Sequence, residues 1–253
     1  MNGDLAAGDF AGGDVSVPWV LPVMDVSRFL ACPARHGFER ERGDGGDFVP
    51  RGSPVGLEFS RAVSGSVSGG EWKASDLISY DADTRSRSEL DAQVAEASDF
   101  HRKWLSESGL KVVDRGVELK FRHGAMDLAG VASLLVSDGH GLWVMDLPMS
   151  PGSRHPPFRW PGLALLFWIA EQVDLGGSRG LKLRGAISGW FSRSSGRRGS
   201  FFVWDRMDML SEAAGLLSNL SAIDAADFAL RSPGIACGGC PDLDCAWNVE
   251  EGK

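Results

Sequence analysis

The sequence is poor in cysteine, in long apolar runs and in positive charge. Four cysteines occur in 253 residues, and the longest apolar stretch, 161–170, is too short to span a bilayer. The first seventeen residues are acidic and glycine-rich, without the apolar segment of a signal peptide. We therefore expect a cytoplasmic protein that does not enter a membrane. The net charge of −8 argues against indiscriminate binding to nucleic acid, but it does not exclude a local basic groove.

The composition is otherwise that of a soluble globular protein, with 43% hydrophobic and 24% charged residues. A chain of this length can bury a full core. We see no internal repeat, and we predict a flexible lead over residues 1–16 followed by a single domain over 17–253. Residues 42–80, rich in glycine, serine and aspartate over 42–70, predict a loop-rich insertion within that domain.

Hydrophobic periodicity predicts an α/β domain with a mixed sheet. A short helix begins near Asp25 or Ser27 and ends or kinks at Pro33. The turn signal D-G-H-G at 138–141 joins two predicted strands. The remaining predicted elements are a helix over 88–105, strands over 111–122, 124–136 and 142–147, a helix over 161–173, a hairpin of 182–191 and 200–204, and a helix over 207–220.

Three of the four cysteines lie together in a glycine- and proline-rich stretch near the end of the chain. Cys237, Cys240 and Cys245 can face one point, and the fourth thiol, Cys32, would come from the other end. This spacing predicts a four-cysteine metal site that ties the N-terminal segment to the C-terminal one, restricting the unfolded chain as a disulfide would. Zinc and an iron–sulfur cluster both fit four thiolates. Two disulfides or free thiols are the alternative, and a cytoplasmic setting disfavours disulfides.

Two carboxylates, Asp127 and Asp146, lie in predicted strands that are otherwise apolar. Carboxylates are costly to bury there unless they are paired or bound to metal. Two such groups side by side can share a divalent cation, and His101 on the preceding helix is a candidate third ligand. The alternative is that the aspartates end their strands and that His101 is a partly exposed helix residue.

Five motifs resemble, in order, those of one enzyme superfamily. They are S-R-F-L-A-C-P at 27–33, A-S-D-F-H at 97–101, G-A-M-D at 124–127, V-M-D-L-P at 144–148 and D-F-A-L-R-S-P-G-I-A-C-G-G-C-P-D-L-D-C at 227–245. Over residues 18–248 the chain resembles the PD-(D/E)XK nuclease superfamily. Within it, the chain is similar to the iron–sulfur group of AddB-type helicase–nuclease subunits and RecB-like CRISPR-associated exonucleases.

The resemblance implies a restriction-endonuclease-like mixed sheet flanked by helices, with its two ends tied by a four-cysteine cluster. It favours a 4Fe–4S cluster over zinc on Cys32, Cys237, Cys240 and Cys245. It also implies a Mg²⁺ or Mn²⁺ site on His101, Asp127 and Asp146. DNA, either single-stranded or at duplex ends, would be the ligand, and a helicase or nuclease subunit would be a possible partner.

The sequence departs from the superfamily at three polar positions. Pro148 stands where the superfamily has the lysine that orients the attacking water, and Leu163 and Phe167 replace the glutamine and tyrosine of Q-x-x-x-Y. Lys120, in E-L-K at 118–120, is a candidate replacement for the lysine. Its alternative is a solvated strand residue.

A basic stretch, R-S-S-G-R-R at 193–198, lies at the tip of the predicted hairpin. Arg193, Arg197 and Arg198 there suit backbone phosphates, and a solvated turn is the alternative. Aromatic residues flank this tip and could either stack on bases or belong to the core; they are Trp190, Phe191 and Trp204.

The sequence therefore predicts a DNA-processing protein that binds DNA and has weak or lost metal-dependent exonuclease activity. One alternative is an active Mn²⁺- or Mg²⁺-dependent exonuclease on single-stranded DNA that uses Lys120. A second is a non-catalytic scaffold subunit of a helicase–nuclease complex. A third is a zinc-stapled interaction domain unrelated to nucleic acid.

Overall fold

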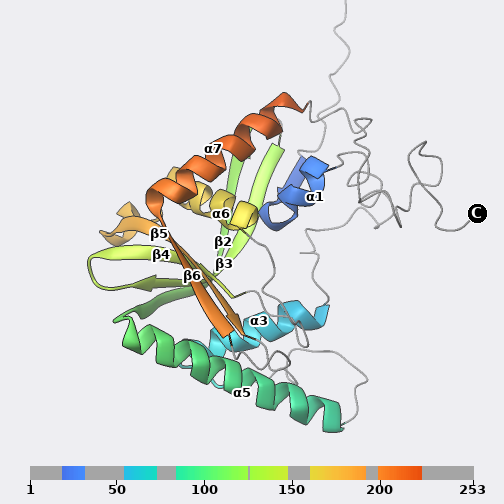
Figure 1. Ribbon diagram of the computed structural model, residues 1–253, viewed down its shortest axis with the longest axis vertical. Coiled ribbons are helices and arrows are strands. Elements are labelled where there is room, and N and C mark those ends of the chain that lie inside the picture. Colours follow the sequence, from blue (N-terminus) through green and yellow to red (C-terminus); the bar gives the residue numbers. More distant parts are fainter. Residues whose placement is uncertain are drawn as a thin grey trace, which may run out of the picture.

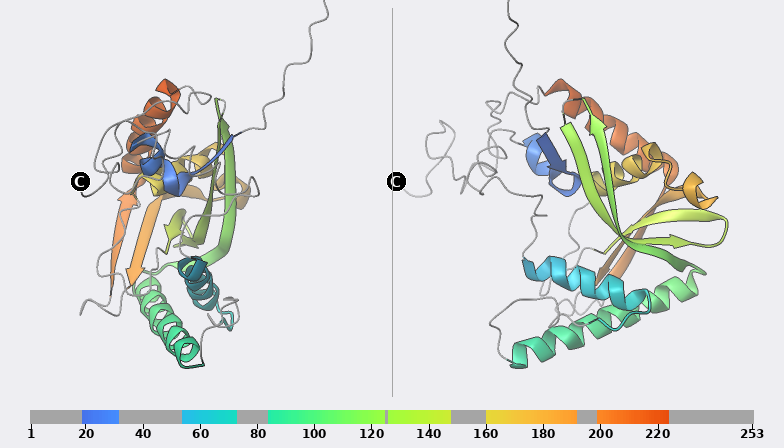
Figure 2. Two further views of the ribbon diagram at one scale, coloured as in Figure 1. Left: turned by 90° about the vertical axis from the view of Figure 1, so that its right-hand side faces the viewer. Right: turned by 180° about the vertical axis from the view of Figure 1, so that it is seen from behind.

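The computed structural model describes residues 19–31, 54–72, 84–124, 126–147, 160–191 and 199–223. These residues form one six-stranded mixed sheet between two layers of helices (Figures 1 and 2). The strands are β1 (Trp19–Pro22), β2 (Lys111–His123), β3 (Met126–Ser137), β4 (Gly141–Asp146), β5 (Lys182–Phe191) and β6 (Gly199–Asp205). The helices are α1 (Val26–Ala31), α3 (Pro54–Val67), α5 (Thr84–Glu107), α6 (Trp160–Gln172) and α7 (Arg206–Ala222), with short 3₁₀ turns η1 (Val23–Asp25) and η2 (Gly177–Arg179).

Strand β3 organises the sheet because three other strands pair with it. Strand β2 runs antiparallel along its whole length, so β1 and β4 must share its other edge. Strand β1 lies parallel to residues 126–129 of β3, and β4 lies antiparallel to residues 134–137. The two halves of β3 therefore have different neighbours on this edge, and this division decides where the predicted site residues lie.

The rest of the sheet continues from β4. Strand β5 is parallel to β4, so the chain must cross between them, and α6 lies in that connection. Strand β6 is antiparallel to β5 and leads directly into α7. The Asp205 carboxylate caps α7 by accepting a hydrogen bond from the Asp208 backbone N–H at 2.9 Å, which satisfies one of the free amides at a helix start.

Two hydrophobic cores lie on opposite faces of the sheet. One packs α1, α6 and α7 against the sheet, and α6 is buried nearly all round, as its uniformly apolar sequence predicts. The other packs α3 and α5 against the opposite face. Both predicted features, a mixed sheet and flanking helices, are confirmed.

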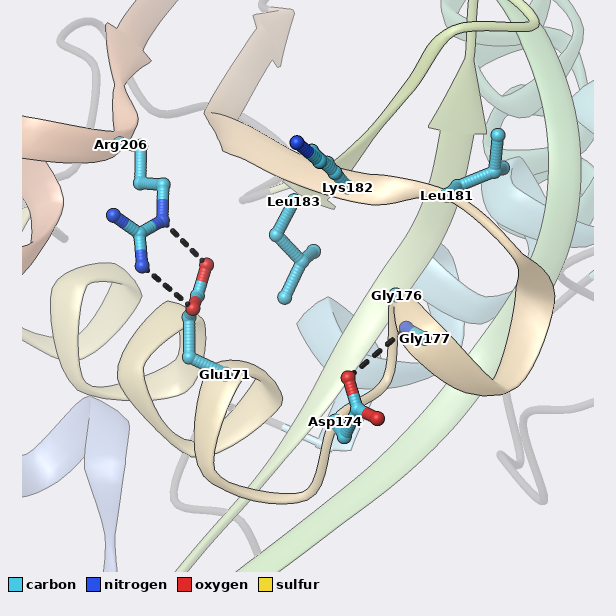
Figure 3. Close-up of a pocket in the computed structure, with 8 residues that line it drawn as sticks. All are labelled: Glu171, Asp174, Gly176, Gly177, Leu181, Lys182, Leu183 and Arg206. Atoms are coloured by element: carbon cyan, nitrogen blue, oxygen red, sulfur yellow. Dashed lines mark hydrogen bonds and ion pairs between the residues drawn. The ribbon is translucent and has the colours of Figure 1, made fainter.

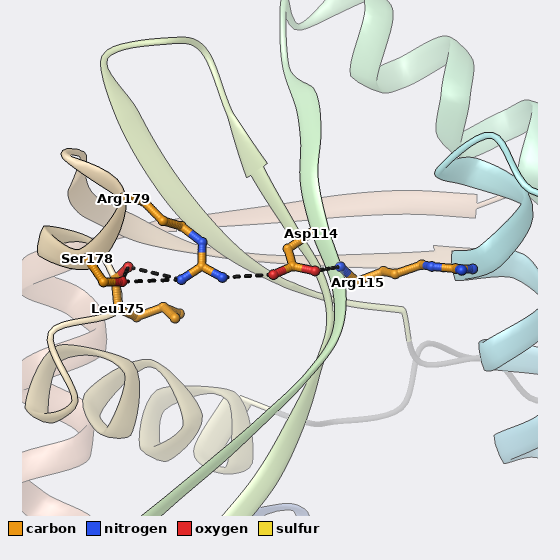
Figure 4. A network of polar contacts seen from close by, with 5 residues as sticks. All are labelled: Asp114, Arg115, Leu175, Ser178 and Arg179. Atoms are coloured by element: carbon orange, nitrogen blue, oxygen red, sulfur yellow. Dashed lines mark hydrogen bonds and ion pairs between the residues drawn. The ribbon is translucent and has the colours of Figure 1, made fainter.

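A polar network fastens the first half of β2 to the turn that follows α6 (Figure 4). Arg179 donates a hydrogen bond to Asp114 at 2.7 Å and also reaches the Leu175 carbonyl and the Ser178 hydroxyl, each at 3.4 Å. Asp114 in turn accepts from the Arg115 backbone N–H at 2.8 Å. The side chains are partly exposed, so the network contributes mainly by positioning β2.

The prediction of a loop-rich insertion over 42–80 is wrong for residues 54–67, which form α3. Phe59, Val63 and Val67 recur every four residues and are buried against α5, and Pro54 occupies the first helical position. Glycine and serine between these apolar residues gave the segment a loop-like composition. The predicted lead over 1–16 lies outside the described residues, and the single domain over 17–253 stays a prediction.

No helix among the described residues combines the length and the apolarity needed to cross a membrane.

Candidate nucleic-acid interface

A charged cluster of Lys120, Arg122 and Asp127 lies where β2 pairs with the first half of β3. Arg122 is directly opposite Asp127 in the ladder, and Lys120 is diagonal to it. Lys120 Nζ lies 2.8 Å from Asp127 Oδ2, and Arg122 Nε lies 2.5 Å from Asp127 Oδ1. The Asp127 side chain is 7% exposed, whereas those of Lys120 and Arg122 are 59% and 54% exposed. Each carboxylate oxygen is therefore bonded to a cation that reaches solvent.

The cluster lies on the face of the sheet away from α6. Met126 and Leu128 flank Asp127 in sequence, and both belong to the core under α6. Leu119 and Phe121 flank Lys120 in the same way. Because side chains alternate along a strand, the charged residues must point to the opposite side. The alternation of apolar and charged residues in L-K-F-R is what creates this polar row.

The two cations keep Asp127 ionised. The hydrogen bond from Lys120 is the largest influence and lowers the pKa of Asp127, and the bond from Arg122 lowers it further. Burial of the carboxylate raises its pKa, but the net shift is downward. A carboxylate in an apolar strand is costly unless it is paired, and Asp127 is paired with two cationic side chains.

Asp146 lies elsewhere, at the last residue of β4. It is 4% exposed, and Ser133 of β3 donates a hydrogen bond to its Oδ1 at 3.3 Å. The Ser133 hydroxyl also accepts from the Leu147 backbone N–H at 3.2 Å. Leu142 and Val144, which share the side of β4 occupied by Asp146, belong to the core under α6. The interpretation that this aspartate ends its strand is confirmed.

His101 is completely buried between α5 and β5. Its Nδ1 lies 2.6 Å from the Ala97 carbonyl oxygen and its Nε2 lies 3.2 Å from that of Gly189. Phe100 and Phe201 contact the ring edge-on. A Cβ at Gly189 would lie 3.0 Å from the imidazole, so glycine is what allows this close approach. The alternative of a partly exposed histidine is wrong.

The structure does not bring the three predicted metal ligands together. Asp127 lies beside β1, whereas Asp146 lies opposite Ser133, six residues further along β3, or roughly 20 Å of extended strand. His101 contacts β5 on the face opposite Asp146. Within the described ranges, no group of three His, Cys, Asp or Glu residues could hold a metal ion. In this arrangement the three side chains do not converge on one Mg²⁺ or Mn²⁺ ion. A metal site formed by all three stays a prediction.

Other predicted site residues have mixed outcomes. Lys120 is next to Asp127, as a replacement lysine would have to be. Leu163 and Phe167 are wholly buried in α6. Trp190 and Phe191 are buried, so the core interpretation holds for them, whereas Trp204 is half-buried. Several predicted residues lie outside the described part of the chain, namely Cys32, Pro148, Arg193, Arg197, Arg198, Cys237, Cys240 and Cys245.

Sequence reasoning missed Arg122 as a site residue. The signal was present, because Glu118, Lys120 and Arg122 recur every second residue and so share one face of a strand. Only the register of β2 against β3, which places Arg122 opposite Asp127, gives this pattern its meaning.

A shallow pocket of about 460 Å³ lies at the end of α6 (Figure 3). Arg206 donates Nε and Nη2 to the two oxygens of Glu171 at 2.9 and 3.0 Å, and Asp174 accepts from the Gly177 backbone N–H at 3.1 Å. The charges of Glu171 and Arg206 therefore neutralise each other, and Asp174 is bonded to a backbone amide. Its lining holds no histidine, cysteine or hydroxyl that could act as a nucleophile or base; it consists of Glu171, Asp174, Gly176, Gly177, Leu181, Lys182, Leu183 and Arg206.

Comparison with known proteins gives structural likeness only. No family model matches the chain, and no curated protein matches it. Among solved structures, it is similar to a candidate exonuclease from Eubacterium rectale, with 11% identity and a TM-score of 0.49, covering 81% of this chain and 79% of the other. It is also similar to SSO0001, with 11% identity, a TM-score of 0.40 and coverage of 84% and 80%. A third likeness is to the alkaline exonuclease LHK-Exo from Laribacter hongkongensis, with 9% identity, a TM-score of 0.34 and coverage of 80% and 88%. At these scores and identities, the likenesses say nothing about the chemistry of this chain.

The burial of His101 predicts a loss of stability in mild acid. Burial lowers the pKa of His101, and the two carbonyl contacts offset this only in part. Below about pH 6.5 the unfolded chain therefore binds a proton that the folded chain excludes. The stability is fully present above that pH and falls by about 1.4 kcal/mol per pH unit below it, until the lowered pKa is reached.

Urea unfolding between pH 7.5 and 5.5 measures this slope. A His101→Gln variant should be less stable at pH 7.5 but should lose less further stability on acidification. A His140→Gln variant, changed at an exposed turn, should keep the slope of the parent chain. Equal slopes for His101→Gln and the parent would show that His101 is not the group responsible.

Proposed function

We propose that this chain is a DNA-binding protein in which metal-dependent exonuclease activity is weak or lost. The motif resemblance over residues 18–248 supports DNA as the ligand. The observation that carries the loss of activity is the pairing of both Asp127 oxygens with Lys120 and Arg122, at 2.8 and 2.5 Å. A divalent cation at Asp127 would have to displace both of these ion pairs.

The arrangement of the other groups supports the same proposal. Hydrolysis by the nucleases that this chain resembles needs carboxylates that converge on one or two metal ions. These ions activate water and neutralise the phosphate. Here Asp146 is on the face of the sheet under α6, whereas Asp127 and His101 are on the opposite face. The lysine position holds Pro148, and the two polar positions on the following helix hold buried Leu163 and Phe167.

One contact favours a second candidate, an active single-stranded DNA exonuclease with a relocated lysine. Lys120 reaches Asp127 at 2.8 Å from the neighbouring strand, and its side chain is 59% exposed. A lysine in this position could contact a scissile phosphate bound beside Asp127. In this arrangement, however, its ammonium group is bonded to the carboxylate that the metal would require.

We also propose that the four cysteines hold a 4Fe–4S cluster. The support is the sequence motif around Cys32, Cys237, Cys240 and Cys245. A brown, iron-containing protein after anaerobic purification is the expected result. A colourless protein that contains zinc would show that the four cysteines hold zinc and not a cluster. A non-catalytic scaffold role beside a helicase or nuclease subunit would suit either metal.

Cleavage of end-labelled single-stranded DNA in Mn²⁺ tests the proposed function. Protein purified anaerobically should bind the DNA, and its cleavage should be within a few-fold of an Asp127→Ala/Asp146→Ala double variant. An Asp99→Ala variant, changed at an exposed carboxylate of α5, controls for the loss of charge. Rapid cleavage by the parent chain and by Asp99→Ala, abolished in the double variant, would establish the active exonuclease instead.

A further inference from the structure

The polar row of β2 and β3 is an accessible cationic surface as well as an ion-pair cluster. Lys120 and Arg122 are each more than half exposed, although both contact a carboxylate that is almost fully buried. Val131, on the same side of β3, is 38% exposed, so solvent reaches this side of the strand pair beyond the cluster itself. Among the residues that the structure describes, Asp127 is therefore the inner partner of both cations, and their outer sides are open to solvent.

We propose that Lys120 and Arg122, held in place by Asp127, bind a backbone phosphate of single-stranded DNA without a metal ion. This inference rests on the proposed DNA-binding function and assigns it a site. Lysine and arginine each have several N–H donors, and each uses only some of them to bond Asp127. The remaining donors can bind phosphate oxygens, and the planar guanidinium suits two of them at once.

Asp127 acts in this site as a positioning residue. Long cationic side chains lose rotamer freedom when they bind a ligand, and that loss weakens binding. A shared carboxylate brings the two charged groups together before the phosphate arrives. Two cations and one carboxylate leave one net positive charge, which matches the single charge of one phosphodiester. Glu118, the next residue on this face of β2, would repel a second phosphate beyond Lys120 and so limits the site to one.

A metal-ligand role for Asp127 predicts the opposite behaviour. If Asp127 held Mg²⁺ or Mn²⁺ for the DNA, chelation would weaken binding, and Asp127→Asn would weaken it as well. If Asp127 is the counter-ion of two phosphate-binding cations, binding persists in EDTA. Asp127→Asn then still binds in EDTA, because both cations remain and the local positive charge rises by one, which offsets the lost positioning.

The test is fluorescence anisotropy of a labelled oligothymidylate in EDTA over a series of salt concentrations. Lys120→Gln/Arg122→Gln should weaken binding at least tenfold and should lower the slope of log affinity against log salt by about 1. Arg102→Gln/Lys103→Gln is the matched control, because it removes one arginine and one lysine that are exposed and paired with acids on α5. This control should bind as the parent chain does.

A further variant separates the binding site from the fold. Lys120→Gln/Arg122→Gln leaves the buried Asp127 without its cations and could unfold the chain. Adding Asp127→Asn removes all three charges, and no unpaired buried charge is left. This triple variant should therefore keep the circular dichroism spectrum of the parent and bind as weakly as the double variant.

Each outcome decides one claim. If the parent chain does not bind the oligonucleotide at low salt, the proposed function fails and this site fails with it. If the parent binds and the folded triple variant binds equally well, DNA binding stands and this site is wrong. If EDTA and Asp127→Asn each abolish binding, Asp127 is a metal ligand and the metal-free site is overturned.

Discussion

Replacing Leu163 by glutamine is expected to lower the free energy of unfolding by about 3 kcal/mol. Leu163 is wholly buried in α6, packed in the core between α1, α6, α7 and the sheet. The change removes apolar contacts and buries an amide among neighbours that are apolar side chains. Chemical unfolding in urea at pH 7.5 measures the loss as a shift of the midpoint.

This substitution restores the first polar residue of the Q-x-x-x-Y pattern. It therefore also tests whether the fold tolerates the polar residues that the superfamily has on this helix. Phe167→Tyr restores the second, and its buried hydroxyl should cost about 1–2 kcal/mol. Val173→Gln, just beyond the same helix and 43% exposed, is the matched control and should change stability by less than about 0.5 kcal/mol. If Leu163→Gln matched this control, Leu163 could not occupy the core position described above.

Replacing Gly185 by alanine is expected to cost about 2–3 kcal/mol. A Cβ at Gly185 would collide with the backbone carbonyl oxygen of Trp204 on the adjacent strand β6. A side-chain neighbour could rotate away, but a backbone carbonyl can move only if β5 and β6 separate. The loss should appear in the urea midpoint and in faster hydrogen exchange of the β5 and β6 amides.

Gly215→Ala is the matched control for this change. Gly215 lies in the middle of α7, and a Cβ there would meet nothing within 4 Å. Alanine is the better helix former, so this variant should gain about 0.5–1 kcal/mol. A Gly185→Ala variant as stable as the parent would mean that β5 and β6 do not approach as closely as described.

The sequence predicted the fold best where apolar residues follow a clear period. The apolar helix at 161–173, the strand at 142–147 and the hairpin of β5 and β6 all match the structure closely. Helix α3 was missed because its four-residue repeat of Phe59, Val63 and Val67 is embedded in glycine and serine. Composition and periodicity conflicted there, and burial against α5 favours the helix.

The candidate site was harder to predict because it depends on long-range register. The sequence shows that Asp127 and Asp146 lie in neighbouring strands, but it does not show which residues face each other. The pairing of Ser133 with Asp146, and of Arg122 with Asp127, follows only from the register of β3 with β4 and with β2. The spacing of the two aspartates suggested that they share a metal ion. In the structure, Asp127 contacts two cations, and Asp146 accepts a hydrogen bond from Ser133.

The parallel pairing of β1 with β3 affects the order in which the molecule assembles. Trp19 lies opposite Met126, so more than a hundred residues must be bridged before this pair of strands can form. The hairpins β2–β3, β3–β4 and β5–β6 close much shorter loops and gain their contacts at lower entropic cost. Strand β1 should therefore dock late. Until it does, the edge of β3 over residues 126–129 presents unpaired backbone groups that another extended peptide can occupy.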